Sequence, residues 1–182
     1  CAIYMMGKGK LKDNTVVTTV MANIGFHKAI KENGGRTEIT AVGDRYVLEN
    51  MLANGYNLGG EQSGHIIFTD FSTTGDGPVT ALQVLSYLKR TRHKASAITK
   101  IMTSYPQLLV NVKVATKDGW EDNEAIKASI EEGKQQLGEN GRILVRPSGT
   151  EPLIRVMAEG PDQKELEEIC YKIADVVKAQ QG

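Results

Sequence analysis

The sequence predicts an α/β protein: a domain with a mixed, mainly parallel sheet, followed by a small α+β domain with the element order βαββα. Strand-like and helix-like stretches alternate through the first half of the chain, which is typical of a parallel sheet. The second half contains three strand-like and two helix-like stretches. A proline-containing segment, residues 103–107, separates the two halves. We therefore expect domains at residues 1–103 and 107–182.

The first domain is predicted from β-branched runs that alternate with stretches of helical period. The expected elements are a strand at 14–20, a helix within 21–35, a strand at 36–42, a helix within 43–55, short strands within 56–60 and 65–70, and a helix within 73–92. The last of these helices begins with a cap-like Asp76 and an early Pro78. Leu82, Leu85 and Leu88 then recur at helical spacing.

The second domain is predicted from alternating apolar runs and one strongly amphipathic helix. The expected elements are strands at 108–114, 141–147 and 151–160 and helices at 123–138 and 162–180. Asp162 and Glu165 form a start that resembles a capping box. The apolar stripe of the last helix consists of Leu166, Ile169, Cys170, Ile173, Val176 and Val177.

Composition disfavours several classes of function. Of the 182 residues, 40% are hydrophobic and 24% are charged, as in globular proteins. Lys+Arg and Asp+Glu balance at 22 each, and only 5% of residues are aromatic, which argues against a nucleic-acid partner. No apolar run approaches the ~20 residues that cross a bilayer, and no signal peptide is evident. Cys1 and Cys170 match no disulfide or zinc spacing, so we expect a protein of the reducing cytoplasm.

The stretch "RPSGTEPLIRVMAEG", residues 146–160, places an arginine, two hydroxyls and a glycine in a tight turn between two strands. A phosphate dianion is bound by a planar fork of N–H groups, by hydroxyls and by unhindered backbone N–H groups. Arg146, Ser148, Gly149 and Thr150 supply these groups, and glycine lets the backbone approach closely. The alternative is ordinary turn chemistry with a solvated arginine. Spacing alone leaves both interpretations open.

A second polar cluster lies in "GGEQSGHII", residues 59–67, where Glu61, Ser63 and His65 follow two glycines. A carboxylate and a hydroxyl in a tight loop suit the hydroxyl groups of a sugar, because a carboxylate accepts two O–H groups well. A Ser-His-Glu nucleophile is disfavoured, because G-E-Q-S-G does not match the G-x-S-x-G elbow and no second acidic group is present to orient the histidine. A structural turn with a structural histidine is the remaining alternative.

A third loop, in "VGDRYV", places Asp44 and Arg45 at the carboxyl end of a predicted parallel strand. Open α/β sheets bind ligands at this edge. Asp44 has an alternative role as a plain helix N-cap. The segment "TTGDGP" contains a single carboxylate, whereas a magnesium site needs more, so we interpret it as a turn and a cap.

These loops, in this order, resemble the carboxyl-terminal half of the α-D-phosphohexomutase superfamily, and the resemblance covers the whole chain. "RPSGTEPLIRVMAEG" is similar to the phosphate-binding loop of the family's last domain, and "GEQSGHII" to the sugar-binding loop of its third domain. "VGDRYVLENM" and "TTGDGPVTALQ" are most similar to a bacterial branch of the family. Those enzymes convert glucosamine 6-phosphate to glucosamine 1-phosphate through a bisphosphate, in amino sugar metabolism and peptidoglycan precursor synthesis.

The resemblance implies part of an isomerase and a role for each loop. The phosphate that is not being transferred would be held by Arg146, Ser148, Gly149 and Thr150. Sugar hydroxyls would be held by Glu61 and Ser63, and the same cleft would be lined by Asp44, Arg45 and His65. The implied partners are a hexosamine phosphate and the family's first two domains, and the resemblance leaves room for a homodimer of the complete enzyme.

Two parts of the family do not occur in this sequence: the Ser-His-Asn-Pro phosphoserine loop and the Asp-Gly-Asp-x-Asp-Arg magnesium loop. We therefore expect no catalytic residue and no bound metal in this chain, Mg²⁺ being a cofactor of the complete enzyme, and we expect the isolated chain to be inactive. The uncapped start "CAIYMM" fits a chain that begins within a helix of the third domain. Another hexose phosphomutase, acting on mannose or glucose phosphates, and a non-catalytic phosphosugar-binding module are the alternatives.

Overall fold

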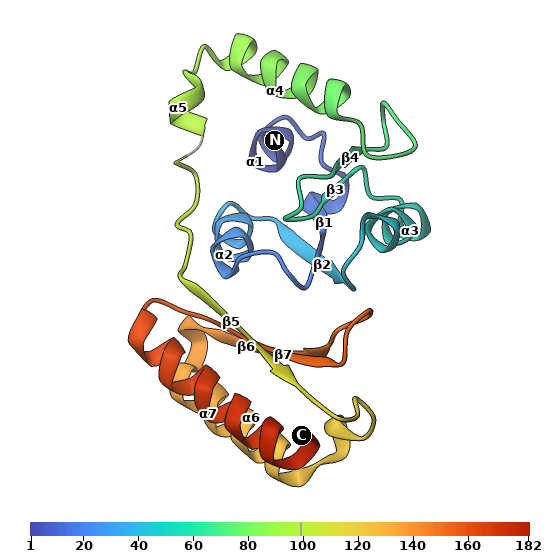
Figure 1. Cartoon of the computed structure of the whole chain (residues 1–182). Coiled ribbons are helices and arrows are strands. Elements are labelled where there is room, and N and C mark those ends of the chain that lie inside the picture. Colours follow the sequence, from blue (N-terminus) through green and yellow to red (C-terminus); the bar gives the residue numbers. More distant parts are fainter. Residues whose placement is uncertain (99) are drawn as a thin grey trace. The chain divides into compact units, whose positions relative to one another are not determined.

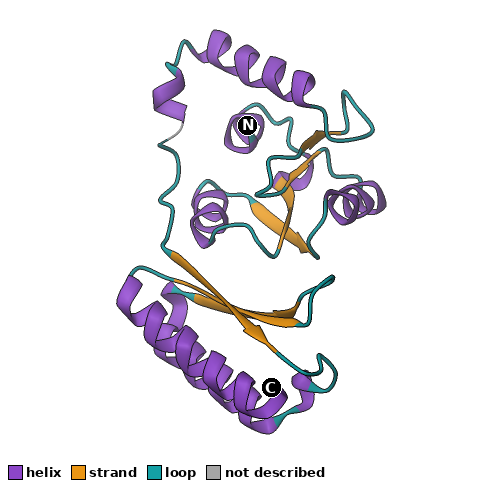
Figure 2. Ribbon diagram, in the orientation of Figure 1, coloured by secondary structure: helices purple, strands orange, loops and turns teal. Residues whose placement is uncertain are grey.

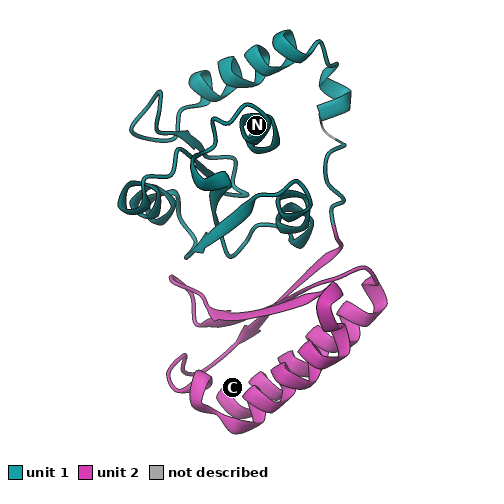
Figure 3. Cartoon of the chain, turned by 180° about the vertical axis from the view of Figure 1, so that it is seen from behind, with its two compact units in different colours: residues 1–104 teal, residues 105–182 magenta. Residues whose placement is uncertain are grey.

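The structure is a computed structural model that describes residues 1–98 and 100–182. The chain divides into two compact units, residues 1–104 and 105–182 (Figure 3). Each unit has its own sheet and its own hydrophobic clusters. Each of the two predicted sites can therefore be built from the elements of a single unit.

Unit 1 contains a four-stranded sheet with the order β2-β1-β3-β4 (Figure 1). The strands are β1 (Thr15–Thr19), β2 (Arg36–Thr40), β3 (Leu58–Gly60) and β4 (Ile66–Phe68). Strand β1 pairs in parallel with both β2 and β3, whereas β3 and β4 are antiparallel. The predicted mixed, mainly parallel sheet is thus confirmed, with all five residues of the central strand β1 buried.

The helices of unit 1 are α1 (Ala2–Gly7), α2 (Ile24–Glu32), α3 (Asp44–Asn54), α4 (Gly77–Thr91) and α5 (Ala95–Ile98). Neighbouring residues of β1 point to opposite faces of the sheet. Val16 belongs to a cluster with residues of α1 and α2, whereas Val17 packs with Val47 and Met51 of α3. Each fully buried aliphatic side chain of this kind contributes about 1.5–3 kcal/mol. The result is helices on both faces of the sheet.

The start signals predicted for helix α4 are confirmed, but two leucines of its predicted apolar stripe remain exposed. The Asp76 carboxylate accepts the N–H of Val79 over 2.8 Å, and Pro78 lies in the first turn. Leu82 and Leu85, however, are 65% and 59% exposed. The helix packs mainly on the edge strand β4, so its spacing predicted the helix correctly without predicting burial of its apolar residues.

Unit 2 has the predicted order βαββα. Its elements are β5 (Gln107–Lys113), α6 (Glu124–Leu137), β6 (Arg142–Pro147), β7 (Leu153–Glu159) and α7 (Gln163–Gln181). Three short 3-10 turns complete the described elements of the chain: η1 (Lys12–Asn14), η2 (Trp120–Asp122) and η3 (Gly138–Asn140). Strand β7 lies between β5 and β6 and is antiparallel to both.

Helices α6 and α7 lie on one face of this sheet (Figure 2). Asp162 begins α7, because its carboxylate accepts the N–H groups of Lys164 and Glu165. The helix-facing residues of β7 are Ile154, Val156 and Ala158, all fully buried in one cluster with α7. Because side chains alternate along a strand, the residues between them, including Arg155, lie on the opposite face.

Candidate functional site

The loop between β6 and β7, which we call the Ser148 loop (residues 148–152), is closed by its own backbone. The Ser148 N–H donates to the Leu153 carbonyl oxygen over 2.8 Å, and the Leu153 N–H donates to the Glu151 carbonyl oxygen over 2.8 Å. Pro147, at the end of β6, fixes the backbone that enters the loop. The turn predicted from Ser-Gly-Thr therefore forms, and it presents Gly149 and Thr150 at the surface.

Three cationic side chains surround this loop. Arg146 of β6 and Arg155 of β7 are direct partners in the strand register, so their side chains lie on the same face. Lys117, from the connection after β5, donates through Nζ to the Ser148 carbonyl oxygen over 2.7 Å. Partial burial, together with the positive charge of Arg155, lowers the pKa of the Arg146 guanidinium. Like charges opposite each other on a sheet are unfavourable, and an anion between them would remove that cost.

Ser148 is only 2% exposed, and its hydroxyl is fixed from two sides. The Glu151 N–H and the Arg155 Nη2–H group each donate to Ser148 Oγ over 3.3 Å. Arg155 Nη2 also lies 3.2 Å from Glu151 Oε2. The buried Arg155 Nε has no hydrogen-bond partner among the described residues. Orphaned buried donors are rare in folded proteins, so this corner has donor capacity that the chain itself does not use.

Gly149 is not required by the backbone of the loop. It is absent from the glycines with positive φ among the described residues, and a Cβ built at this position meets no atom within 4 Å. Other glycines differ in this respect: Gly64 has a positive φ and Gly59 has close neighbours, whereas Gly7 and Gly77 are as open as Gly149. A ligand that approaches the backbone closely is a physical reason for glycine at 149.

The sequence named Arg146, Ser148, Gly149 and Thr150 as candidate residues of this loop, and the structure adds Lys117 and Arg155 to the candidates. Arg155 is brought to the loop by strand register, and Lys117 by a connection from a different strand. The alternation of β7 was a usable signal for Arg155, because it places every second residue on the face opposite the helices. No local pattern marks Lys117.

In unit 1, the cluster of Glu61, Ser63 and His65, which we call the Glu61 cluster, lies in the hairpin between β3 and β4. The loop is closed by the Glu61 N–H, which donates to the His65 carbonyl oxygen over 3.0 Å. Gly64 has φ +102, and a Cβ at Gly60 would lie 2.8 Å from the His65 carbonyl oxygen. Both glycines are therefore needed for a turn this tight.

The three side chains contact one another. Ser63 Oγ donates to Glu61 Oε1 over 2.5 Å. His65 Nδ1 lies 2.9 Å from Ser63 Oγ and 3.2 Å from Glu61 Oε1. A hydrolytic triad needs one imidazole nitrogen for the nucleophile and the other for the carboxylate. Here a single nitrogen faces both groups and the serine donates directly to the carboxylate, so the arrangement disfavours a nucleophilic Ser63.

The Glu61 carboxylate is 11% exposed, and its Oε1 atom binds the other two members of the cluster. Next to His65, which is 55% exposed, lies a hollow of about 360 Å³. Its lining includes Gly75, Asp76, Gly77 and Thr80 from the start of α4. The segment that the sequence predicted as a turn and a cap therefore also forms a wall beside the Glu61 cluster.

Asp44 and Arg45 begin helix α3. The N-cap is Gly43, with φ +135, and Asp44 is the first helical residue, where its carboxylate accepts the N–H of Arg45. The alternative role of Asp44 as an N-cap is therefore wrong, because the glycine that enters the helix occupies that position. Since β2 and β3 both run parallel to β1, the loops at Asp44 and Glu61 lie at the same edge of the sheet. Arg45 is 80% exposed and bound to Glu49 over 2.7 Å.

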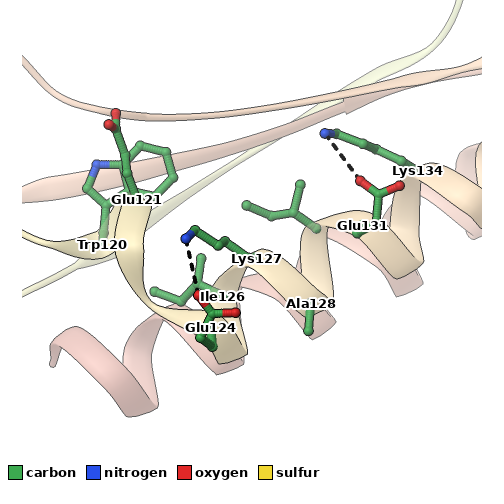
Figure 4. A pocket seen from close by; sticks show the side chains of 9 residues that line it. Trp120, Glu121, Glu124, Ile126, Lys127, Ala128, Glu131 and Lys134 are labelled. Atoms are coloured by element: carbon green, nitrogen blue, oxygen red, sulfur yellow. Dashed lines mark hydrogen bonds and ion pairs between the residues drawn. The ribbon is translucent and has the colours of Figure 1, made fainter.

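A larger hollow of about 570 Å³ in unit 2 is lined by Trp120 and by one side of α6 (Figure 4). Two of its cations are already paired, Lys127 with Glu124 over 3.2 Å and Lys134 with Glu131 over 3.6 Å. No residue of the Ser148 loop lines it. Both of its lysines are thus paired with carboxylates, and Glu121 adds a further negative charge, so the hollow makes a poor anion site despite its size.

Among the described residues, no group of three His, Cys, Asp or Glu side chains is placed to hold a metal ion. Asp76, the carboxylate of the one segment that resembles a metal loop, serves as the cap of α4. These residues do not fit a magnesium site, so no chemical step is assigned to a metal here. No helix within residues 1–98 and 100–182 is long and apolar enough to span a membrane.

Two family models match the chain. The model of the phosphoglucomutase/phosphomannomutase alpha/beta/alpha domain III matches residues 1–105, and the model of the phosphoglucomutase/phosphomannomutase C-terminal domain matches residues 109–176. The chain therefore belongs to the phosphoglucomutase/phosphomannomutase family, as its loops indicated.

Within this family the chain is similar to bacterial phosphoglucosamine mutases. It is 57% identical over 180 residues to the phosphoglucosamine mutase of Brevibacillus brevis, covering 99% of this chain and 40% of that protein. It is 53% identical over 182 residues to that of Bacillus pumilus, covering 100% of this chain and 41% of that protein. The chain thus spans about two fifths of the length of these relatives and corresponds to their carboxyl-terminal domains III and IV.

Solved structures share the fold. An Aspergillus fumigatus N-acetylphosphoglucosamine mutase in complex with GlcNAc-6P and magnesium superposes with a TM-score of 0.79 at 21% identity, covering 100% of this chain and 43% of that one. A phosphoglucomutase/phosphomannomutase family protein from Burkholderia thailandensis has a TM-score of 0.70 at 20% identity, covering 98% and 40%. At such identities the likeness supports the architecture of the chain.

Proposed function

We propose that this chain is the substrate-gripping part of a phosphoglucosamine mutase, which interconverts glucosamine 6-phosphate and glucosamine 1-phosphate through a bisphosphate. The observation that carries the proposal is the pair of guanidinium groups, Arg146 and Arg155, placed opposite each other at the Ser148 loop. The identity of 57% to a curated phosphoglucosamine mutase supports the choice of substrate.

In this proposal the phosphate that is not being transferred binds at the Ser148 loop. Arg146 offers a planar fork for two phosphate oxygens, Ser148 and Thr150 offer hydroxyls, and Gly149 offers an open backbone. Each hydrogen bond to a charged group contributes about 1.5–3 kcal/mol where it is shielded from water. Partial burial and the positive charge of Arg155 lower the pKa of Arg146, and a bound phosphate would offset both effects.

The sugar ring binds at the Glu61 cluster. Oε1 of Glu61 is occupied by Ser63 and His65, which leaves Oε2 to accept sugar hydroxyls. Asp44 and Arg45, at the same edge of the sheet, line the same binding site as the Glu61 cluster. A mutase must hold its substrate with either end presented to the reacting phosphoryl group. A fixed phosphate-binding site at the Ser148 loop and a separate hydroxyl-binding site at the Glu61 cluster satisfy that need.

The chemical step needs parts that these 182 residues do not supply. The phosphoserine loop and the magnesium loop of the family have no counterpart in the sequence. Phosphoryl transfer depends on a positioned nucleophile and metal. We infer that this chain alone binds phosphosugars and has no turnover, and that catalysis requires the family's first two domains.

The test is a titration of the purified chain with glucosamine 6-phosphate, followed by calorimetry or by amide NMR shifts. Arg146→Ala should weaken binding about tenfold or more. Lys172→Ala is the matched control, because Lys172 is an exposed cation of the same unit that pairs with Glu132 on the helical layer. It should bind like the wild type.

Two results would contradict the proposal in different ways. A folded chain that binds no hexose phosphate would favour a non-catalytic module. Turnover by the chain alone would contradict the expected inactivity. The family's printed name also covers phosphoglucomutase and phosphomannomutase, so mannose 6-phosphate and glucose 6-phosphate belong in the same titration. Tighter binding of either sugar would move the assignment to another hexose phosphomutase.

A further inference from the structure

Toward a ligand, the Ser148 hydroxyl can act only as a hydrogen-bond donor. A hydroxyl has two acceptor positions and one proton. Both acceptor positions of Ser148 Oγ are filled, one by the Glu151 N–H and the other by the Arg155 Nη2–H group, each over 3.3 Å. Within residues 1–98 and 100–182 its proton has no acceptor. The proton is therefore available to a ligand that carries only acceptors, such as a phosphate dianion.

Arg155 is itself held in place by the loop that it supports. Its Nη2 atom donates to Glu151 Oε2 over 3.2 Å as well as to Ser148 Oγ, so both hydrogens of that nitrogen are used inside the protein. Lys117 holds the Ser148 carbonyl oxygen from another side over 2.7 Å. The hydroxyl, its backbone and the guanidinium thus form one preorganised unit before any ligand arrives.

The geometry points to Arg155 as a positioning residue that turns the Ser148 proton toward the bound phosphate and shares that task with Glu151. This inference rests on the proposed phosphate binding at the Ser148 loop. It assigns Arg155 the role of orienting the Ser148 hydroxyl. It also assigns Glu151, a carboxylate next to the proposed phosphate site, a role that favours phosphate binding. By Coulomb's law alone Glu151 should oppose phosphate binding. As the residue that holds Arg155, it should favour it.

The first experiment is a titration of the chain with inorganic phosphate, followed by amide NMR shifts at several salt concentrations. Arg155→Lys keeps the charge but loses the fork that reaches both Ser148 and Glu151. It should weaken binding about tenfold while the salt dependence stays unchanged, because no charge is lost. Ser148→Ala should weaken binding to a similar extent, and the double variant should be no weaker than Ser148→Ala alone.

The second experiment uses the sign of the effect at Glu151, an exposed residue that can be replaced without disturbing the core. Glu151→Ala should weaken phosphate binding although it removes a negative charge. Glu131→Ala, which removes an exposed carboxylate of α6 in the same unit, is the matched control and should leave binding unchanged. A gain in affinity for Glu151→Ala, or losses that multiply in the Ser148→Ala/Arg155→Lys double variant, would overturn the inference.

A measurement without ligand separates this inference from the proposed function. In Arg155→Lys the Glu151 N–H, which donates to Ser148 Oγ, should exchange with solvent several-fold faster than in the wild type. Unchanged exchange would overturn the positioning role even if phosphate binds. If the wild-type chain instead shows no phosphate binding, the proposed function fails, whatever the exchange rates are.

Discussion

Arg146 on β6 and Arg155 on β7 are register partners at the end of the hairpin that carries the Ser148 loop. Two guanidinium groups face each other there on the side of the sheet opposite α6 and α7. Sheets normally avoid like charges in this relationship, because they cost about 0.2–1 kcal/mol. An arrangement that is unfavourable in the empty protein and favourable with a dianion present is what a phosphate site requires.

The charge opposition predicts a trade-off between stability and binding. Arg146→Gln should leave the ligand-free chain as stable as the wild type or more stable, by up to about 1 kcal/mol. The same variant should lose most of its stabilisation by added phosphate, which for the wild type follows the ratio of phosphate concentration to Kd. Thermal unfolding with and without phosphate measures both effects. A variant that is destabilised without ligand would show that the arginine pair is not under repulsion.

Gly149 should be replaceable for folding but not for binding. A methyl group at this position meets no protein atom within 4 Å, so Gly149→Ala should unfold at the wild-type temperature. The methyl group should obstruct close approach of a phosphate and weaken its binding by about 1–3 kcal/mol. Gly7→Ala, another open position, is the control for the substitution itself. Equal phosphate affinity in Gly149→Ala would remove the steric argument for glycine in the loop.

A substitution in the Glu61 cluster should affect binding of the sugar phosphate but not binding of inorganic phosphate at the Ser148 loop. Glu61→Gln should weaken binding of glucosamine 6-phosphate about tenfold, because an amide is a poorer acceptor of sugar hydroxyls than a carboxylate. Binding of inorganic phosphate should stay unchanged. Parallel titrations of the same protein sample check both. A similar loss for the two ligands would mean that Glu61 acts through the fold of the chain.

Cys170 should be unreactive in the folded protein. Burial raises the pKa of its thiol to about 11, whereas the pKa of a free cysteine is about 8.5. A raised folded pKa contributes stability that is fully present below the unfolded pKa and is lost as the pH rises through 11. The free energy of unfolding should therefore fall more steeply above about pH 8.5 in the wild type than in Cys170→Ala. Rapid labelling of Cys170 by a thiol reagent at pH 8 would contradict this.

The fold was predictable because local signals agree with the tertiary structure. The period-2 pattern of residues 108–114 and the helical stripe from Leu166 to Val177 each predicted one buried face, and in both elements that face packs into the core of unit 2. Asp162 and Asp76 cap their helices as predicted, since caps are local hydrogen bonds. Burial of α4 was less predictable, because the spacing of Leu82 and Leu85 shows an apolar face but not what covers it.

The site was predictable only as far as its residues are neighbours in the chain. Ser148, Gly149 and Thr150 could be assigned to one turn from the sequence. Arg155 required the register of β7 against β6, and Lys117 required a contact between residues 31 positions apart. Asp44 was misplaced as an N-cap candidate, because the glycine before it takes an unusual φ that only the structure reveals.

Strands β6 and β7 are joined by residues 148–152 alone, whereas β5 reaches β7 only after α6 and β6 have intervened. Loop closure costs least for segments close in sequence, so we expect the β6–β7 hairpin to form early in folding and β5 to join later. The hairpin end with Arg146, the Ser148 loop and Arg155, where we propose that phosphate binds, would then be assembled in the transition state. Stopped-flow refolding should therefore be faster in the presence of phosphate. If phosphate leaves the refolding rate unchanged and slows only unfolding, this part of the hairpin forms after the transition state.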